Sequence, residues 1–133
     1  MPTSTRAKGR AFETWCRDRL VEQGWAVHLC GRKAMMIGPG RLVTAGNDIM
    51  GADLVAVRSD QPYTLFVQAT MDSGVTKRLT ETQKYPWNLS AQRVELWQKK
   101  PDGSVVVQVY TGGGFAEIGR YIRGKFYLKG GSQ

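Results

Sequence analysis

Three polar side chains that could do chemistry fall within one short stretch of the sequence, residues 47–70. They are the carboxylate of Asp53, the side-chain amide of Gln68 and the hydroxyl of Thr70. In this stretch two apolar runs flank a polar, proline-containing segment at residues 58–62, a pattern that predicts a β-hairpin. The three side chains would then belong to the two strands of one hairpin.

The turn of this hairpin decides which side chains meet. With the turn centred on residues 60–61, Asp53 lies directly opposite Gln68. Opposed residues of an antiparallel pair share a face, with Cβ atoms roughly 5 Å apart, and Thr70 projects from that face too. The hairpin therefore predicts a carboxylate, an amide and a hydroxyl at one edge of a sheet. The ordinary alternatives are a turn-capping role for Asp53 and a buried, backbone-satisfied amide for Gln68.

The elements before the hairpin would carry further site residues. Residues 6–23 have apolar side chains at steps of three and four, which predicts a helix that Gly24 ends. Glu13 lies at the rim of its apolar stripe. Residues 25–30 alternate and predict a strand. Residues 31–46, rich in glycine and basic residues, predict a long, mobile loop apposed to a phosphate backbone.

The elements after the hairpin complete an α/β pattern. Residues 75–85 predict a helix capped by Ser73, and residues 93–98 and 104–111 predict two strands. Residues 112–133 look like a basic, aromatic C-terminal extension, with a short helix near residues 116–123. This order predicts one domain over residues 1–133, an α/β sandwich with a central mixed sheet flanked by helices, after a disordered lead at residues 1–5.

The charge balance favours a polyanionic partner. The chain of 133 residues has 19 Lys and Arg against 11 Asp and Glu, a formal charge of +8, and nucleic acid is the commonest polyanion in a cytosol. No apolar run approaches the ~20 residues of a membrane span, and the first residues lack the apolar core of a signal peptide. We therefore expect a cytoplasmic protein that binds DNA and no membrane, with Cys16 and Cys30 as buried thiols.

In their order along the chain, these features resemble the PD-(D/E)XK nuclease superfamily, and within it the small Holliday-junction-resolvase-like endonucleases of archaea and phages. Residues 8–13 resemble the opening helix motif, in which a glutamate, here Glu13, helps to bind metal. Residues 48–56 resemble the stretch that delivers the central metal-binding aspartate, here Asp53. Residues 68–70 fall where the family has Glu-x-Lys or Gln-x-Lys.

The resemblance implies a restriction-endonuclease-like sandwich and a homodimeric enzyme that hydrolyses phosphodiesters in branched DNA. Mg²⁺, with Mn²⁺ as a substitute, would be held by Glu13, Asp53, Gln68 and the carbonyl of Ala69. Six basic residues would hold DNA phosphates without reading sequence. They are Arg6, Lys8, Arg10, Arg32, Lys33 and Arg41.

Two departures from the family pattern affect the expected chemistry. Gln68 replaces the usual carboxylate, so its oxygen would bind Mg²⁺ more weakly. Thr70 replaces the usual lysine and supplies no cation. In some superfamily members the lysine has moved to the following helix, and Lys84, or else Lys77, would take that role here.

Two other functions fit the same residues. The chain could be a catalytically inactive DNA-binding module with the nuclease fold, in which Gln68 and Thr70 mark a lost active site. It could also be a structural or packaging protein whose extension at residues 112–133 mediates assembly.

Overall fold

The computed structural model describes residues 5–30, 33–38, 41–45, 49–71 and 74–130, and for residues 5–7, 33–38 and 41–45 it describes the backbone alone. The helices in these ranges are α1 Thr5–Glu22 and α2 Val75–Thr82. The strands are β1 Ala26–Leu29, β2 Lys33–Gly38, β3 Arg41–Ala45, β4 Leu54–Val57, β5 Thr64–Thr70, β6 Gln92–Lys99, β7 Val105–Tyr110, β8 Phe115–Ile122 and β9 Lys125–Leu128.

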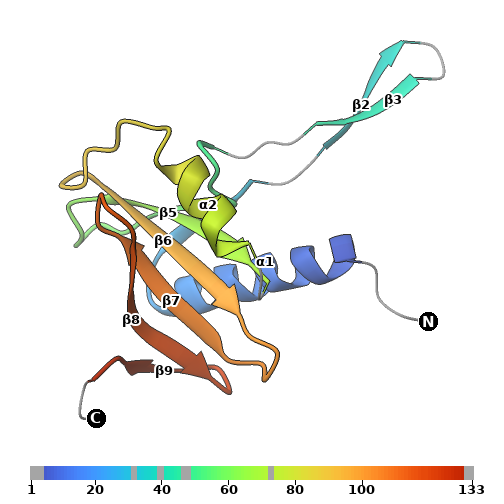
Figure 1. Ribbon diagram of the computed structural model, residues 1–133. Coiled ribbons are helices and arrows are strands. Elements are labelled where there is room, and N and C mark those ends of the chain that lie inside the picture. The colour runs from blue at the N-terminus through green and yellow to red at the C-terminus, as the bar shows by residue number, and fades with distance from the viewer. Residues whose placement is uncertain (1–4, 31–32, 39–40, 46–48, 72–73, 131–133) are drawn as a thin grey trace.

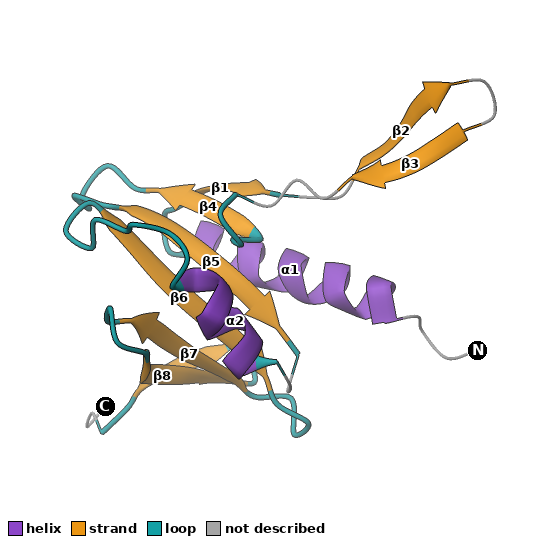
Figure 2. Ribbon diagram, turned by 45° about the horizontal axis from the view of Figure 1, so that its top comes forward, coloured by secondary structure: helices purple, strands orange, loops and turns teal. Residues whose placement is uncertain are grey.

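A mixed seven-stranded sheet in the order β1-β4-β5-β6-β7-β8-β9 forms the body of the molecule (Figure 1). Its neighbouring strands are antiparallel except β5 and β6, which are parallel and are connected through α2. The two helices lie on opposite faces of the sheet (Figure 2). The predicted α/β class, with a mixed sheet between helices, is confirmed.

The core on the α1 side follows from the spacing of apolar residues in α1. Phe12, Cys16 and Leu20 recur at steps of four, so one stripe of the helix faces the sheet, and all three are buried in one cluster. The strands contribute Leu54 and Val67, both fully buried, to that cluster. The predicted helix is confirmed, although it begins at Thr5, and Gly24 ends it with a φ of 95° that favours glycine.

A smaller cluster covers the opposite face. Phe66 from β5 and Val94 from β6 are buried there, and Leu79 from α2 packs against them with Trp87. The alternation of strand side chains sends Phe66 toward α2 and its neighbour Val67 toward α1. As a result β5 is buried on both faces and forms a rigid support for any side chain at its end.

The hairpin register predicted from the sequence is confirmed. Leu54 pairs with Val67 and Ala56 with Leu65, which is the register of a turn centred on residues 60–61. The strand predicted at residues 25–30 is also confirmed as β1, which pairs antiparallel with β4.

The interpretation of residues 31–46 as a long loop is wrong. β2 and β3 pair antiparallel in a separate two-stranded sheet, which extends away from the seven-stranded sheet (Figure 1). Apolar and β-branched residues on both sides of a Pro-Gly dipeptide are a hairpin signal, and pairing satisfies backbone groups that a loop would leave to water.

The interpretation of residues 112–133 as an extension with a helix is also wrong. Residues 115–128 instead form β8 and β9, which continue the main sheet. Tyr121 of β8 is 4% exposed and belongs to the cluster under α1. Strand pairing with β7 and this burial outweigh any local helical preference.

Smaller differences concern the helix after the hairpin. It ends at Thr82 and not at Tyr85, because the Trp87 indole donates a hydrogen bond of 2.9 Å to the Thr82 carbonyl and the chain turns there. The disordered lead predicted for residues 1–5 is wrong at Thr5, which begins α1. Residues 1–4 of that lead and the predicted cap Ser73 lie outside the described residues.

Candidate functional site

Asp53 is fixed by the backbone at the start of β4. Its N–H donates to the Val67 carbonyl and its carbonyl accepts from the Cys30 N–H, each at 2.8 Å. Continuing the hairpin register by one residue places Asp53 opposite Gln68, as the sequence predicts. The carboxylate turns toward β5, where its Oδ2 accepts a hydrogen bond of 2.9 Å from the Ala69 N–H.

A cation from α2 lies against this carboxylate. Arg78 Nη1 is 3.5 Å from Asp53 Oδ2. The same guanidinium donates to the carbonyl of Ala69 at 3.2 Å and to that of Gly51 at 3.5 Å. The Arg78 side chain is 30% exposed and that of Asp53 is 16% exposed, so the pair sits at the surface of the fold with one side open to solvent.

The side-chain oxygen of Gln68 is buried. Gln68 is 1% exposed, and its Nε2 donates a 2.6 Å hydrogen bond to Thr82 Oγ1. Thr82 Oγ1 donates its single hydroxyl proton to the Arg78 carbonyl at 2.8 Å. Gln68 Nε2 must therefore be the donor in the hydrogen bond between Gln68 and Thr82. Among the described residues, Gln68 Oε1 has no hydrogen-bond partner. An unpaired buried oxygen is costly unless something else engages it.

Glu13 belongs to the same neighbourhood, on the α1 side. Burial raises the pKa of the Cys16 thiol well above its usual value, and the negative charges of Asp53 and Glu13 raise that pKa further. Two carboxylates from separate elements therefore act on one buried thiol. The two carboxylates belong to different elements, Glu13 to α1 and Asp53 to the residue before β4.

Thr70 ends β5 two residues beyond Gln68. It is 8% exposed. Gly74, just before α2, lies close to it, because a Cβ added to Gly74 would be 3.7 Å from Thr70 Oγ1. Thr70 is therefore enclosed by the start of α2, on the face of the sheet that α2 covers.

These residues offer hard oxygen donors that suit a Mg²⁺ ion. The donors are the carboxylates of Asp53 and Glu13, the amide oxygen of Gln68 and the Ala69 carbonyl, and Mg²⁺ prefers such ligands. The observation that supports the fit is the buried Gln68 Oε1, which has no hydrogen-bond partner among the described residues. Within the ranges that the structure describes, no group of three or more His, Cys, Asp or Glu side chains is placed to hold a metal ion.

Within the described residues, neither of the two lysines predicted to replace Thr70 forms an ion pair with Asp53. Lys77 is exposed on α2. Lys84 lies beyond the end of α2 and pairs with Glu81 at 3.2 Å, with its side chain 59% exposed. The predicted two-turn stripe is therefore wrong, because the helix ends before it reaches Lys84.

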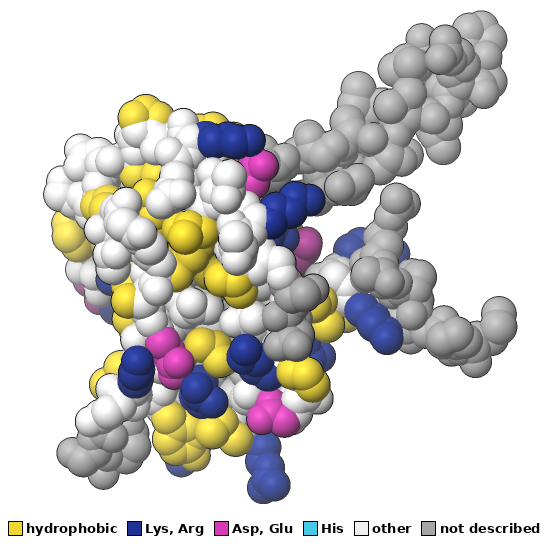
Figure 3. Space-filling view, viewed as in Figure 1, with side chains coloured by type: hydrophobic (Ala, Val, Ile, Leu, Met, Phe, Trp, Pro, Cys, Tyr) yellow, Lys and Arg dark blue, Asp and Glu magenta, His cyan; other side chains and the backbone are white. Residues whose placement is uncertain are grey.

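The predicted phosphate-binding residues are only partly described. Lys8 and Arg10 are on α1, where Lys8 and Arg10 are both exposed. Arg6, Lys33 and Arg41 are in regions where the backbone alone is described, and Arg32 lies outside the described residues. On the face shown in Figure 3, Lys and Arg side chains are interspersed with Asp and Glu and do not form one continuous patch.

Sequence reasoning missed Arg78, which is the cation nearest to Asp53 in α2. A signal was present, because Val75, Arg78, Leu79 and Thr82 follow the steps of three, four and seven residues that place side chains on one face of a helix. This face packs on the sheet, so an arginine within it must direct its charged group to an acceptor at the rim.

No protein-family model, no curated protein and no solved structure matches this chain. Neither helix in the described ranges is long and apolar enough to cross a membrane.

Proposed function

We propose that the chain is a metal-dependent DNA endonuclease that hydrolyses phosphodiester bonds in branched DNA. The observation that carries the proposal is the placement of Asp53 beside Gln68 and Ala69 at the end of the β4–β5 hairpin, where the buried Gln68 Oε1 has no hydrogen-bond partner among the described residues. Such a group of oxygens is suited to a divalent cation.

The order of the elements supports a restriction-endonuclease-like fold. Helix α1 is followed by strands β1, β4 and β5, by α2, and by β6 parallel to β5. The candidate residues follow one another along the chain, with Glu13 on α1, Asp53 before β4 and Gln68 on β5. This order agrees with the family resemblance of the sequence.

Each residue of the proposed site would have a separate role in catalysis. Asp53, Gln68 and the Ala69 carbonyl would hold Mg²⁺, and Glu13 would approach it from α1. Bound Mg²⁺ would supply Lewis-acid stabilisation of negative charge and an activated water. Arg78 would neutralise charge on the phosphate in place of the lysine that Thr70 replaces, because a guanidinium can pair with two phosphate oxygens at once.

Branched DNA and a homodimer complete the proposal. Four-way junctions have approximate two-fold symmetry, so paired cuts require two active sites related by a similar axis. The formal charge of +8 and the exposed Lys8 and Arg10 on α1 support phosphate contacts.

The test is cleavage of a labelled four-way junction and its matched linear duplex with Mg²⁺, with Mn²⁺ and with a chelator. We expect paired, metal-dependent cuts in the junction that Asp53→Asn reduces at least about a hundredfold, while junction binding is retained. The substituted amide oxygen can still accept from the Ala69 N–H, so the fold should persist. Asp18→Asn, on the exposed surface of α1, is the matched control and should cut normally. Unchanged cleavage by Asp53→Asn would reject the site.

An inactive DNA-binding module is the second candidate. It is favoured by the Arg78 guanidinium lying at the oxygens of Asp53 and Ala69, where it would compete with a metal ion. This candidate predicts salt-sensitive junction binding without cutting under any metal condition.

A further inference from the structure

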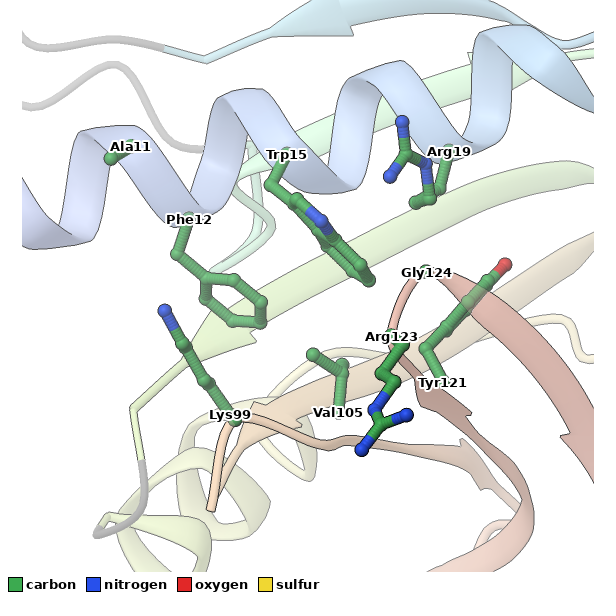
Figure 4. A pocket seen from close by; sticks show the side chains of 10 residues that line it. Ala11, Phe12, Trp15, Arg19, Lys99, Val105, Tyr121, Arg123 and Gly124 are labelled. Carbon is green, nitrogen blue, oxygen red and sulfur yellow. The ribbon is translucent and has the colours of Figure 1, made fainter. Parts of the chain in front are cut away.

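A pocket separate from the Asp53 cluster lies between α1 and the strand ends of the sheet. Its volume is about 540 Å³, within the range of roughly 300–1,000 Å³ typical of small-ligand sites. Figure 4 shows the rings of Phe12 and Trp15 directed from α1 toward the strands, with Tyr121 on the strand side. Lys99 and Arg123 lie on either side of Val105 in this view.

The walls of the pocket are aromatic. Phe12 and Trp15 are stacked with ring centroids 6.0 Å apart, and Tyr121 meets Trp15 edge-on at 5.3 Å. Trp15 is only partly buried, so it offers ring surface to a ligand. Aromatic rings of this kind can stack on the flat face of a nucleobase.

The rim of the pocket is positive. Lys99, Arg123 and Arg19 line it, and none of the described residues that line it is Asp or Glu. Arg19 forms an ion pair with Glu22 at 2.7 Å, and its guanidinium lies 5.2 Å from the Trp15 ring centroid. Within the described part of the chain, Lys99 and Arg123 form no ion pair, so their charges are available to an anion.

Arg123 occupies a backbone conformation that arginine disfavours. Its φ is 52°, and that of Gly124 is 79°. These two residues form the two-residue turn between Ile122 and Lys125, which pair with each other. Turns with positive φ at both central residues strongly prefer Asn-Gly. Strained positions of this kind concentrate at functional sites, and here the strained residue carries its guanidinium to the pocket.

The pocket opens at the same end of the sheet as the Asp53 cluster. Thr70 of β5 pairs with Gln98 of the parallel neighbour β6, and Lys99 follows directly. Adjacent strands lie about 4.8 Å apart. On α1, Phe12 of the pocket directly precedes Glu13 of the candidate site. The pocket under α1 and Thr70 under α2 therefore lie at the same end of the sheet, on its opposite faces.

We propose that this pocket binds one unpaired nucleotide of a DNA strand, with the base against Trp15 and the phosphate between Lys99 and Arg123. A paired base is enclosed within its duplex and must leave the stack to enter a pocket of this size. The proposal rests on the proposed function for its biological meaning, because unpaired nucleotides at a branch point would then be a feature of the substrate that the enzyme recognises.

The test is a binding titration in chelator, so that cutting does not contribute. The probes are a fluorescent single-stranded oligodeoxynucleotide of roughly ten nucleotides, the same sequence as a blunt duplex, and the same strand with abasic sites. We expect the single strand to bind more tightly than the duplex, and the abasic strand to bind about fivefold or more weakly than the intact strand, because stacking is lost.

The decisive variant is Arg123→Asn. It creates the preferred Asn-Gly turn, so the fold should be as stable as the wild type or more stable. It should nevertheless weaken single-strand binding and lower the slope of log affinity against log salt by about 0.7, the value for one lost phosphate contact. Lys99→Ala should act in the same direction. Lys125→Ala removes the same charge from the same hairpin without lining the pocket, and should bind like the wild type.

Three results would overturn the pocket assignment: equal binding of duplex and single strand, equal binding of intact and abasic strands, or wild-type affinity and salt slope in Arg123→Asn. These results are distinct from failure of the nuclease proposal. An absence of cutting by the wild type would leave the chelator titration fully interpretable.

Discussion

Asp53 pairs with a cation where the proposed chemistry needs a metal ion. The guanidinium of Arg78 meets Asp53 Oδ2 and the Ala69 carbonyl, two of the oxygens assigned to Mg²⁺. Two cations a few ångströms apart repel each other, by several kcal/mol even at a protein-like effective dielectric constant of about 20. Metal binding therefore requires Arg78 to move outward, and its partly exposed side chain leaves it room to do so.

Arg78→Ala should separate these two roles of the arginine. We expect Mn²⁺ to bind the variant about tenfold more tightly, because a competing charge is removed. Junction cleavage should fall about a hundredfold, because the cation that we propose to neutralise the phosphate is lost. Mn²⁺ binding followed by electron paramagnetic resonance measures the first effect, independently of activity.

The control for Arg78→Ala is Arg17→Ala, which removes an arginine paired with Asp18 on the surface of α1 and should alter neither quantity. Weaker Mn²⁺ binding in Arg78→Ala would mean that the arginine holds the oxygens in place and does not compete with the metal. Lys77→Ala and Lys84→Ala should cut better than Arg78→Ala, since neither lysine forms an ion pair with Asp53 among the described residues.

Among the elements, the β8–β9 hairpin contributes most beyond the expected fold. It carries Tyr121 into the core under α1 and places Arg123 at the pocket. Its close packing depends on Gly119, where a Cβ would lie 2.6 Å from the Tyr127 carbonyl oxygen and 2.5 Å from Phe126 Cζ. A side chain at this position would have to displace backbone.

Gly119→Ala should therefore destabilise the protein by about 1–3 kcal/mol, the usual cost of overpacking. Urea denaturation measures this change as a lower midpoint. Gly113→Ala is the matched control, because nothing lies within 4 Å of the added Cβ and the backbone there has no positive φ. Equal midpoints for the two variants would show that β9 does not pack on β8 as described.

At the scale of the whole molecule, two buried acids link stability to alkaline pH. Burial raises the pKa of the Cys16 thiol and that of the Tyr121 phenol above their usual values. In the unfolded chain these groups ionise near pH 8.5 and pH 10, respectively. Below those pH values the thiol and the phenol keep their protons in both the folded and the unfolded chain, so the free energy of unfolding has its full value. Above them the unfolded chain releases protons that the folded chain keeps, so stability falls as pH rises.

We expect the thermal midpoint to decline above about pH 8.5, with one group contributing at most about 1.4 kcal/mol per pH unit. Cys16→Ala should lower the midpoint at neutral pH, because it leaves a cavity, but should flatten the decline between about pH 8.5 and 10. Thermal denaturation of both proteins across this range measures the difference. Parallel curves for the two proteins would rule out Cys16 as a source of the pH dependence.

How far the sequence could predict the fold depends on the range of the interactions involved. The α1 stripe, the Gly24 stop and the register that opposes Asp53 to Gln68 all follow from local periodicity and turn chemistry, and all were predicted correctly. The β2–β3 pair and the β8–β9 hairpin were not predicted. Their strands become favourable only when a partner strand satisfies the backbone and, for Tyr121, when α1 covers the side chain.

The sequence by itself determined the chemistry available to this protein, because residue type and spacing set the charge, the apolar stripes and the carboxylate, amide and hydroxyl of the hairpin. The tertiary structure alone decided which groups meet. It brought Arg78 to Asp53, where Lys77 or Lys84 was expected, and it joined α1 to the β8–β9 turn in one pocket. These meetings depend on packing between elements distant in the chain, which local patterns do not encode.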